Sequence, residues 1–409
     1  MRRVLAAGLL GLLMNSAFAA DAPREEGDPL RLQLSHAMTR DSNLYRLPDG
    51  LDASALSPDS NASRDDVVSR TSAALDAGWE MGLQAFALNL NVDDNRYADN
   101  ESLDNTSGNG RADWNWRLGH QWTGQLGGGY GRSLSGFVNS RFLGRDVLES
   151  SDYHGAARYQ LTPHWSLVAK GRVAEGSHDT PARQQDDFES NSRTFGIDYR
   201  TGRGDSFGLE YRRTGTSFPN ERPPPDFIIA PLFQSRRYVD REANLNARYA
   251  FTVKTSLQGS VGYVWRHYPE GVLGDFAGAT WNAALLWEPR MKTRVTISQW
   301  QDLTAYLDSE SSYFRSRGTR VTVAWLPSQR LTFAFDVSDE RHDYEGFDPG
   351  ALAEPARRDT LQAARVSATW IPRQRLAFDL TWGLERRDSN RPLFDFDDRT
   401  ASLGLRLIF

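Results

Sequence analysis

The feature that most constrains this chain is an alternation of apolar and polar residues, repeated in segments of about ten to fourteen residues. It runs through residues 112–122, 257–266, 376–387 and 402–409; in the third, Leu376, Phe378, Leu380 and Trp382 alternate with charged and polar side chains. Strand side chains point to opposite faces in turn, so each segment predicts a strand with one apolar face. Strands of this length cross an outer membrane when tilted, whereas the strands of a soluble sandwich are shorter.

Four connections between these segments share one design: residues 159–165, 287–292, 325–331 and 370–376. Each has an aromatic residue before or after a proline-containing turn, and proline belongs there because it cannot donate to a strand ladder. An aromatic ring with a polar edge suits the boundary between lipid and water. The tryptophans predicted at this membrane interface are Trp165, Trp287, Trp325 and Trp370.

Longer polar stretches separate the hairpins: residues 41–66, 92–110, 176–190, 219–236, 269–275, 304–312, 342–358 and 388–397. Short connections at one end and long ones at the other are typical of outer-membrane barrels. We therefore predict an all-β protein, a single antiparallel up-and-down transmembrane β-barrel over residues 30–409 with about 18 strands and long extracellular loops. Sixteen strands remain the alternative if Leu30–Arg40 or one weak hairpin, such as Val67–Ala77 with Met81–Val92 across Gly78, lies outside the wall. We expect the loops Asp41–Asp66 and Pro219–Arg236 to constrict the lumen.

The N-terminus has the features of a secretory signal peptide. Two arginines precede the apolar run Val4–Met14, and Ala17-Phe18-Ala19 forms a small-residue cleavage site. The run is shorter than the roughly 20 residues that a spanning helix needs. We predict cleavage after Ala19, a short periplasmic segment over residues 20–29, and the outer membrane of a Gram-negative bacterium as the destination.

The composition is compatible with a membrane barrel only when the alternation of apolar and polar residues is taken into account. A hydrophobic content of 39% and a mean hydropathy of −0.58 would suggest a soluble protein, but only alternate residues of a barrel strand meet lipid. The absence of cysteine excludes disulfides, thiolate metal sites and a lipoprotein anchor. With 48 basic against 53 acidic residues, the chain lacks the basic surface that nucleic acid requires.

Strand parity places many charged residues on the inner face. Only Lys170, Lys254 and Lys292 are lysines, so the other basic residues are arginines, whose planar fork binds carboxylates and hydroxyl-rich ligands in pairs. These side chains either pair with one another or line a path for a hydrophilic substrate. The candidate lumen residues are Arg117, Arg172, Arg200, Arg212, Arg248, Arg266, Arg294, Arg365, Arg387, Arg406, Asp198, Glu210, Asp336 and Asp379; Asp113, Glu242 and Glu385 share their parity.

Enzymatic signals are weak. No H-E-x-x-H spacing or G-x-S-x-G elbow is present, and Gly127–Gly131 lies in a strand pattern rather than before a helix. His120 and His267 are predicted at outward-facing strand positions. The sequence thus predicts neither an enzyme nor a metal or cofactor site. The histidines are His36, His120, His154, His164, His178, His267 and His342.

Two segments resemble known outer-membrane proteins. The last strand ends in Phe409, and this ending is similar to the terminal strand that the barrel-assembly machinery recognises. The stretch Asp41–Gly50 resembles the D-x-N-[aromatic or Leu]-x-R-L segment after the first strand of EpsL-type barrels. These barrels are encoded in exopolysaccharide operons that are often associated with an exosortase. The hairpin layout is similar too, and the architecture more distantly resembles alginate-type exporters. The resemblance implies passage of a polysaccharide across the outer membrane, delivered by a periplasmic polysaccharide-export protein.

Three functions therefore follow as expectations. The first is export of an exopolysaccharide through a polar, arginine-rich lumen, with outer-membrane lipid around the wall. The second is diffusion of small hydrophilic solutes through a general or substrate-specific porin. The third is an enzyme or structural barrel with a closed interior.

Overall fold

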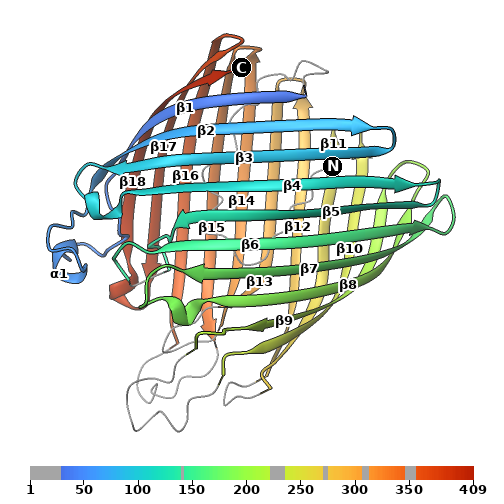
Figure 1. Ribbon diagram of the computed structural model, residues 1–409, viewed down its shortest axis with the longest axis horizontal. Helices are drawn as coiled ribbons and strands as arrows, with labels where there is room; N and C mark the ends of the chain where they lie inside the picture. The colour runs from blue at the N-terminus through green and yellow to red at the C-terminus, as the bar shows by residue number, and fades with distance from the viewer. Residues whose placement is uncertain (1–28, 140–141, 222–234, 270–274, 306–312, 346–355) are drawn as a thin grey trace.

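Eighteen antiparallel strands form one closed barrel in the computed structural model (Figure 1). The structure describes residues 29–139, 142–221, 235–269, 275–305, 313–345 and 356–409, so the predicted signal peptide and most of Pro219–Arg236 lie outside the described residues. Each strand pairs with its neighbour in the chain, and β1 pairs with β18 to close the ring. The predicted 18 strands are confirmed. The alternative of sixteen is wrong, because Leu30–Asp41 is β1 and pairs on both sides.

The first nine strands are β1 Leu30–Asp41, β2 Asp66–Met81, β3 Gln84–Tyr97, β4 Asn105–Leu118, β5 Trp122–Leu134, β6 Val147–Gln160, β7 Trp165–His178, β8 Phe188–Arg200 and β9 Ser206–Ser217. The other nine are β10 Tyr238–Thr252, β11 Thr255–His267, β12 Phe276–Arg290, β13 Thr293–Ala305, β14 Tyr313–Ser328, β15 Leu331–Glu345, β16 Arg358–Arg373, β17 Leu376–Ser389 and β18 Phe396–Ile408. The one α-helix of the described residues, α1 Ala53–Leu56, lies between β1 and β2, and short 3₁₀ turns occupy Glu101–Leu103, Gln184–Asp186 and Pro392–Phe394. No helix among the described residues is long and apolar enough to cross a membrane.

The two ends of the barrel differ in their connections. Tight turns join the strands at one end, which also carries the start of β1 and the end of β18, where Leu32 and Phe409 exchange backbone hydrogen bonds of 3.1 and 2.8 Å. We call it the short-turn end. The connections that contain α1 and the other long segments emerge at the opposite, long-loop end (Figure 1).

The tryptophan–proline connections build a recurrent bulge at the short-turn end. Strand register shifts between Trp287 and Arg290 and between Trp325 and Ser328, and again after Trp370. Each shift contains the proline, which has no N–H for the ladder and fits where pairing is interrupted. The four predicted tryptophans are all about half exposed on the outer wall.

Two turn predictions are wrong by a few residues. The first hairpin turns at Gly82, with φ of 62°, rather than at Gly78. The predicted strand over residues 112–122 breaks at Gly119, with φ of 60°, so His120 lies in a turn and not on an outward strand position. Positive φ is accessible to glycine without steric cost, and the apolar period continues across the turn, which hid the break.

Loop boundaries also differ from expectation. Residues 92–110 are mostly strand, because β3 extends to Tyr97 and β4 begins at Asn105. Conversely, residues 135–146 form a connection between β5 and β6 that the sequence did not predict. Its apolar residues Phe137, Val138 and Leu143 imitate the strand pattern around them.

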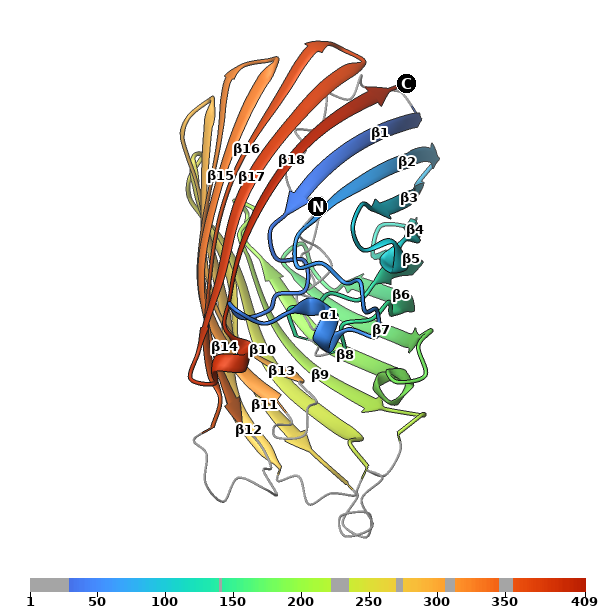
Figure 2. The ribbon, with the colours of Figure 1, turned by 90° about the vertical axis from the view of Figure 1, so that its left-hand side faces the viewer.

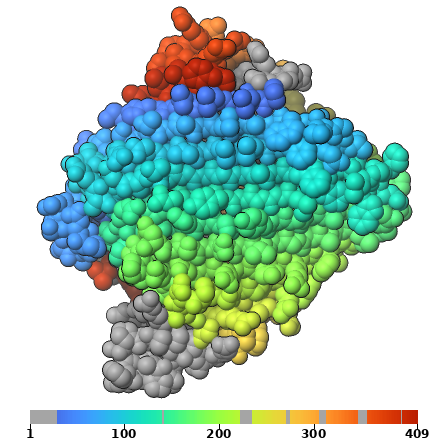
Figure 3. Space-filling view, in the orientation of Figure 1, coloured from blue at the N-terminus to red at the C-terminus, as the bar shows by residue number. Residues whose placement is uncertain are grey.

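The wall has an apolar outer face and a charged inner face. Large apolar side chains at alternate positions, such as Phe378, Leu380 and Trp382 on β17, are 37–57% exposed. Figure 3 shows the outer face over the first strands as a continuous wall. The intervening residues point inward, and many of the charged ones make cross-strand ion pairs.

Candidate functional site

All fourteen candidate lumen residues lie at inward strand positions. Asp379, for example, falls between the outward Phe378 and Leu380 of β17, and Arg387 has the same parity further along that strand. The same alternation places Arg266 on the face opposite Trp265, and Glu210 opposite Leu209. Strand parity therefore determined the orientation of these side chains correctly.

Most of these charges have a partner on a neighbouring strand. Arg266 donates two hydrogen bonds of 2.8 Å to Asp240, and Arg406 lies 3.1 Å from Asp379. Further inward pairs are Arg172 with Asp152, Arg212 with Glu242, Arg294 with Glu288, Arg158 with Asp198 and Lys170 with Glu210. Cross-strand pairing of opposite charges stabilises the wall. It leaves a hydrated, strongly polar inner surface that carries both positive and negative side chains.

Three predicted lumen arginines differ from this pattern. Arg117, Arg200 and Arg248 have no ion pair with any residue that the structure describes. Arg117 is the next-to-last residue of β4, Arg200 is the last of β8, and Arg248 pairs in register with Ser206, the first residue of β9. All three thus lie near the short-turn end, where they place uncompensated positive charge at the inner rim.

The long-loop end is narrowed by three connecting segments that pack on one another. We call residues 42–65, 98–104 and 135–146 the loop assembly, of which 140 and 141 are not described. Its apolar core comprises Tyr45, Leu47, Ala53, Ala62, Leu103, Phe137 and Leu143, all under 9% exposed. In Figure 2, which faces this end, α1 and its flanking chain lie across the opening of the ring.

Arg46 attaches the first segment of the assembly to the wall. Its guanidinium lies 3.0 Å from Asp41, 3.4 Å from Glu385 and 3.1 Å from Asp398, on β1, β17 and β18. Asn43 supports the same turn by donating to the carbonyl of Leu47 at 2.8 Å and accepting from its N–H at 2.9 Å. Arg46 adopts a φ of 55°, an uncommon conformation for a residue with a side chain, which this set of contacts stabilises.

The second segment is connected to the first through Asn100. Tyr45 donates its hydroxyl to Asn100 at 3.0 Å, and Asn100 donates to Asp66 at 2.8 Å. Leu103, fully buried, belongs to the same apolar cluster as Tyr45. The two segments are thus joined by side-chain hydrogen bonds and by a shared apolar core.

The third segment reaches a distant strand. Arg387 on β17 donates to the carbonyl of Val138 at 2.7 Å and to the side chain of Asn139 at 2.9 Å, nearly 250 residues away in sequence. Tyr45 packs on Phe137 with ring centroids 4.8 Å apart. The assembly thus contacts the barrel wall on both sides of the closing β1–β18 pair.

Burial and neighbouring groups shift the pKa values of three ionisable side chains in the assembly. Burial by itself would lower the pKa of Arg46, but the carboxylates of Asp41, Glu385 and Asp398 raise it above its ordinary value. Burial raises the pKa of the Tyr45 phenol to about 12. Burial would raise the pKa of Asp146 as well, yet its contact with His178, 2.8 Å away, opposes burial and helps to hold that pKa below its ordinary value.

Sequence reasoning identified residues 41–66 as a constricting segment but missed the residues that hold it. Glu385 was predicted only as an inward charge, Asp398 was not singled out, and the segment 135–146 was not recognised as a loop. Gly136, just after the last polar alternation of β5, was the one local signal that the strand had ended.

No group of three or more potential metal ligands occurs among the described residues. His154 contacts Asp113 at 3.1 Å and Arg111 at 3.1 Å, inside the wall network. Gly127 permits that contact, because a Cβ there would lie 2.3 Å from Asp113. The glycine run of β5 therefore makes room for inward side chains.

Comparison with known proteins gives a coarse result. Residues 243–409, the C-terminal part of the barrel, match the family model described as "Putative beta-barrel porin 2". No curated protein matches the chain. The chain is therefore porin-like in sequence over its last nine strands.

Solved structures similar in backbone include porins of Pseudomonas. The outer membrane protein OpdK of Pseudomonas aeruginosa is 12% identical, with 93% of this chain and 99% of that chain covered and a TM-score of 0.47. OccK2 (OpdF) of Pseudomonas aeruginosa, in complex with glucuronate, is 10% identical over 93% and 98%, with a TM-score of 0.49. A BenF-like porin from Pseudomonas fluorescens Pf-5 is 10% identical over 94% and 99%, with a TM-score of 0.49.

Proposed function

We propose that this barrel is an outer-membrane diffusion channel for small hydrophilic solutes, with a preference for anions. The observation that carries the proposal is the inner face, where paired charges of both signs keep the lumen wet and three unpaired arginines lie at one rim. The porin family match over residues 243–409 supports the same class. The loop assembly narrows the other end, which favours small solutes over folded or bulky ones.

Planar-bilayer conductance tests this function. The purified full-length barrel is expected to give steady open channels whose reversal potential in a KCl gradient indicates anion preference. Because fixed cations attract anions into a narrow aqueous path, the variant R117Q/R200Q/R248Q should lose most of that preference while keeping its conductance. Replacing Arg96, Arg132 and Arg386, which face outward, provides the matched control and should change neither. A barrel without conductance would contradict the proposal.

Export of an exopolysaccharide is the second candidate, favoured by one observation. Asp41, Asn43 and Arg46, the residues that resemble the EpsL-type segment, are those that fasten the first loop to the wall. In this case the fastened loop would be a gate that a periplasmic polysaccharide-export protein opens. Gene deletion should then leave polymer synthesis intact while surface polymer falls and periplasmic polymer accumulates; unchanged secretion would remove this candidate.

Destination and assembly are part of the proposal. A cleaved signal peptide predicts that the mature protein in the outer-membrane fraction begins at Ala20, which N-terminal sequencing measures. Recognition of Phe409 by the barrel-assembly machinery predicts that deleting this residue slows assembly in cells. A mature N-terminus that retains Met1 would overturn the first of these statements.

A further inference from the structure

One cross-strand row on the outer wall carries three arginines that face lipid. Arg193 on β8, Arg213 on β9 and Arg241 on β10 are direct register partners. All three are exposed, and they share the face of Phe195 and Leu209, which are 65% and 57% exposed. Like charges directly opposite one another destabilise a sheet, and arginine facing hydrocarbon is costly.

These arginines differ from three others on the outer wall, each of which has an acidic partner. Arg96 lies 2.9 Å from Asp94, Arg132 lies 3.1 Å from Glu149, and Arg386 lies 2.6 Å from Asp388. By contrast, none of the three in the row has an ion pair with a residue that the structure describes. The row therefore offers three guanidinium groups to an external anion.

The depth of the row fits the outer leaflet. Arg193 is six residues from Tyr199, which packs on the interfacial Trp165 at the short-turn end. For a strand tilted by about 40°, six residues rise about 15 Å, whereas the apolar band of such barrels is about 25 Å tall. A flexible arginine side chain extends from this height toward the membrane surface, which brings its guanidinium close to the headgroup side of the acyl chains.

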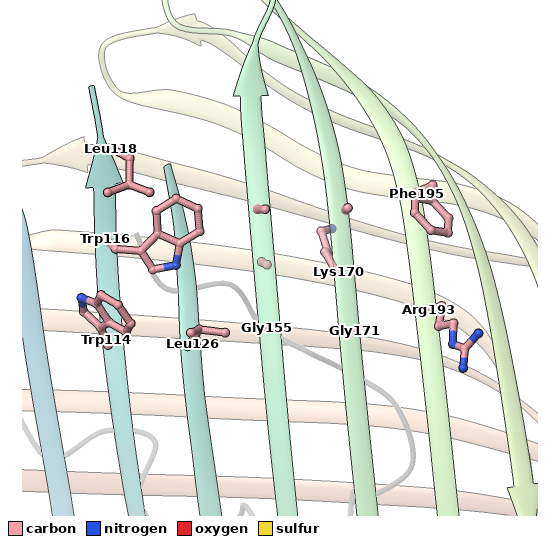
Figure 4. Close-up of a pocket in the computed structure, with 12 residues that line it drawn as sticks. Trp114, Trp116, Leu118, Leu126, Gly155, Lys170, Gly171, Arg193 and Phe195 are labelled. Carbon is pink, nitrogen blue, oxygen red and sulfur yellow. The ribbon is translucent and has the colours of Figure 1, made fainter. Parts of the chain in front are cut away.

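The same row continues into an apolar groove. Leu126, Gly155 and Gly171 precede Arg193 in register on β5, β6 and β7. The glycines form the floor of a hollow of about 450 Å³, with Trp114 and Phe195 at its sides (Figure 4). A second hollow of about 510 Å³ shares Leu126, both glycines and Arg193. A groove of this kind accommodates a hydrocarbon chain.

We propose that this face binds a phosphorylated glycolipid of the outer leaflet, of the lipid A type. Its phosphates would lie on Arg193, Arg213 and Arg241, because guanidinium forms paired, charge-assisted hydrogen bonds with phosphate. One of its acyl chains would lie over Gly155 and Gly171. The juxtaposition of a tri-cationic row with an apolar groove matches a ligand that carries anionic and apolar groups side by side.

Binding of bisphosphorylated lipid A to the purified, delipidated full-length barrel tests the proposal, measured by native mass spectrometry. The variant R193Q/R213Q/R241Q should bind at least about tenfold more weakly, since loss of a single charge-assisted hydrogen bond has an effect of that size. The matched control R96Q/R132Q/R386Q should bind within about twofold of the unmodified protein. Heat-modifiable gel mobility checks that each variant is folded.

The groove has its own pair of variants. A Cβ at Gly171 meets no atom within 4 Å, so Gly171→Leu fills the hollow without disturbing the strand; it should weaken lipid binding, whereas Ala364→Leu on the outer face of β16 should not. Three results would each overturn the proposal. Dephosphorylated lipid A could bind equally well, or millimolar inorganic phosphate alone could displace the lipid. Gly171→Leu could also abolish an oligomer, which would show that a second copy of the chain occupies this face. Because these residues face outward, channel conductance should stay unchanged in every variant, which separates this test from that of the channel function.

Discussion

The two ends of the barrel differ in how their inward-facing arginines are surrounded. At the long-loop end, Arg387 is buried and the side chain of Arg46 is only 14% exposed, and each is held by partners on distant segments. At the short-turn end, Arg117, Arg200 and Arg248 are open, and every connection is a tight local turn. The difference shows that this barrel is narrowed at the end where long connections pack on one another across the ring. At the end with short turns, no connection is long enough to reach the arginines of the inner rim, and they stay unpaired among the residues that the structure describes.

Removing the Arg46 side chain should give the largest effect at the long-loop end. Arg46→Ala leaves Asp41, Glu385 and Asp398 facing one another without a cation, and breaking a buried ion pair in this way costs about 3 to 5 kcal/mol. We expect hydrogen exchange within residues 42–65 to accelerate accordingly, and channel conductance to rise.

The matched control is Arg386→Ala, one residue from Arg387 but on the outer wall, where its ion pairs are solvent-exposed. It should change the stability of the loop assembly by less than about 0.5 kcal/mol. An unchanged exchange rate in Arg46→Ala would show that the assembly does not depend on this contact.

Emptying the apolar core of the assembly should have the next largest effect. Leu103 is fully buried among Tyr45, Phe137 and Leu143, so Leu103→Ala creates a cavity and should cost about 2 to 4 kcal/mol of local stability. Limited proteolysis of residues 42–65 measures the opening. If the cleavage rate of this variant equalled that of the unmodified protein, the three segments would not form one unit.

Acid should loosen the third segment of the assembly. The pKa of Asp146 in the folded state lies below its ordinary value, so its stabilising contribution is complete above about pH 4 and is lost as the pH falls through the folded value. Cleavage within residues 135–146 should increase over that range. Asp146→Asn should be cleaved faster at neutral pH and lose this acid dependence, and a retained dependence would assign it to another group.

A substitution at the short-turn end should reduce the stability of the barrel least. Pro327 lies in the bulge after Trp325, in a position without a ladder hydrogen bond, so Pro327→Ala should cost less than about 1 kcal/mol through the entropy of the unfolded chain. Urea unfolding of the barrel in detergent measures it. A loss as large as that in Arg46→Ala would remove the contrast between the two ends.

Much of the fold was predictable because a strand's side-chain period is local. The alternation around Leu380 and Leu405 fixed both the strands and the inward positions of Asp379 and Arg406. Turn positions were less certain, because Gly82 and Gly119 interrupt the chain without interrupting its apolar period. The segment 135–146 was missed for the same reason, since Phe137 and Leu143 look like strand residues until their neighbours across the lumen are known.

The sequence by itself predicted a barrel of about 18 strands, with sixteen as the alternative, an apolar outer wall and a charged interior, since these depend on a period of two residues and on the length of each segment. The pairing of Leu30–Asp41 on both sides decided the number of strands. Tertiary structure alone decided which charges are neutralised and where the lumen narrows. Arg387 finds Val138 nearly 250 residues away only after β18 closes on β1, and Arg193, Arg213 and Arg241 become one row only in the register of three strands. Contacts between distant residues depend on the geometry of the closed ring, which no local pattern encodes.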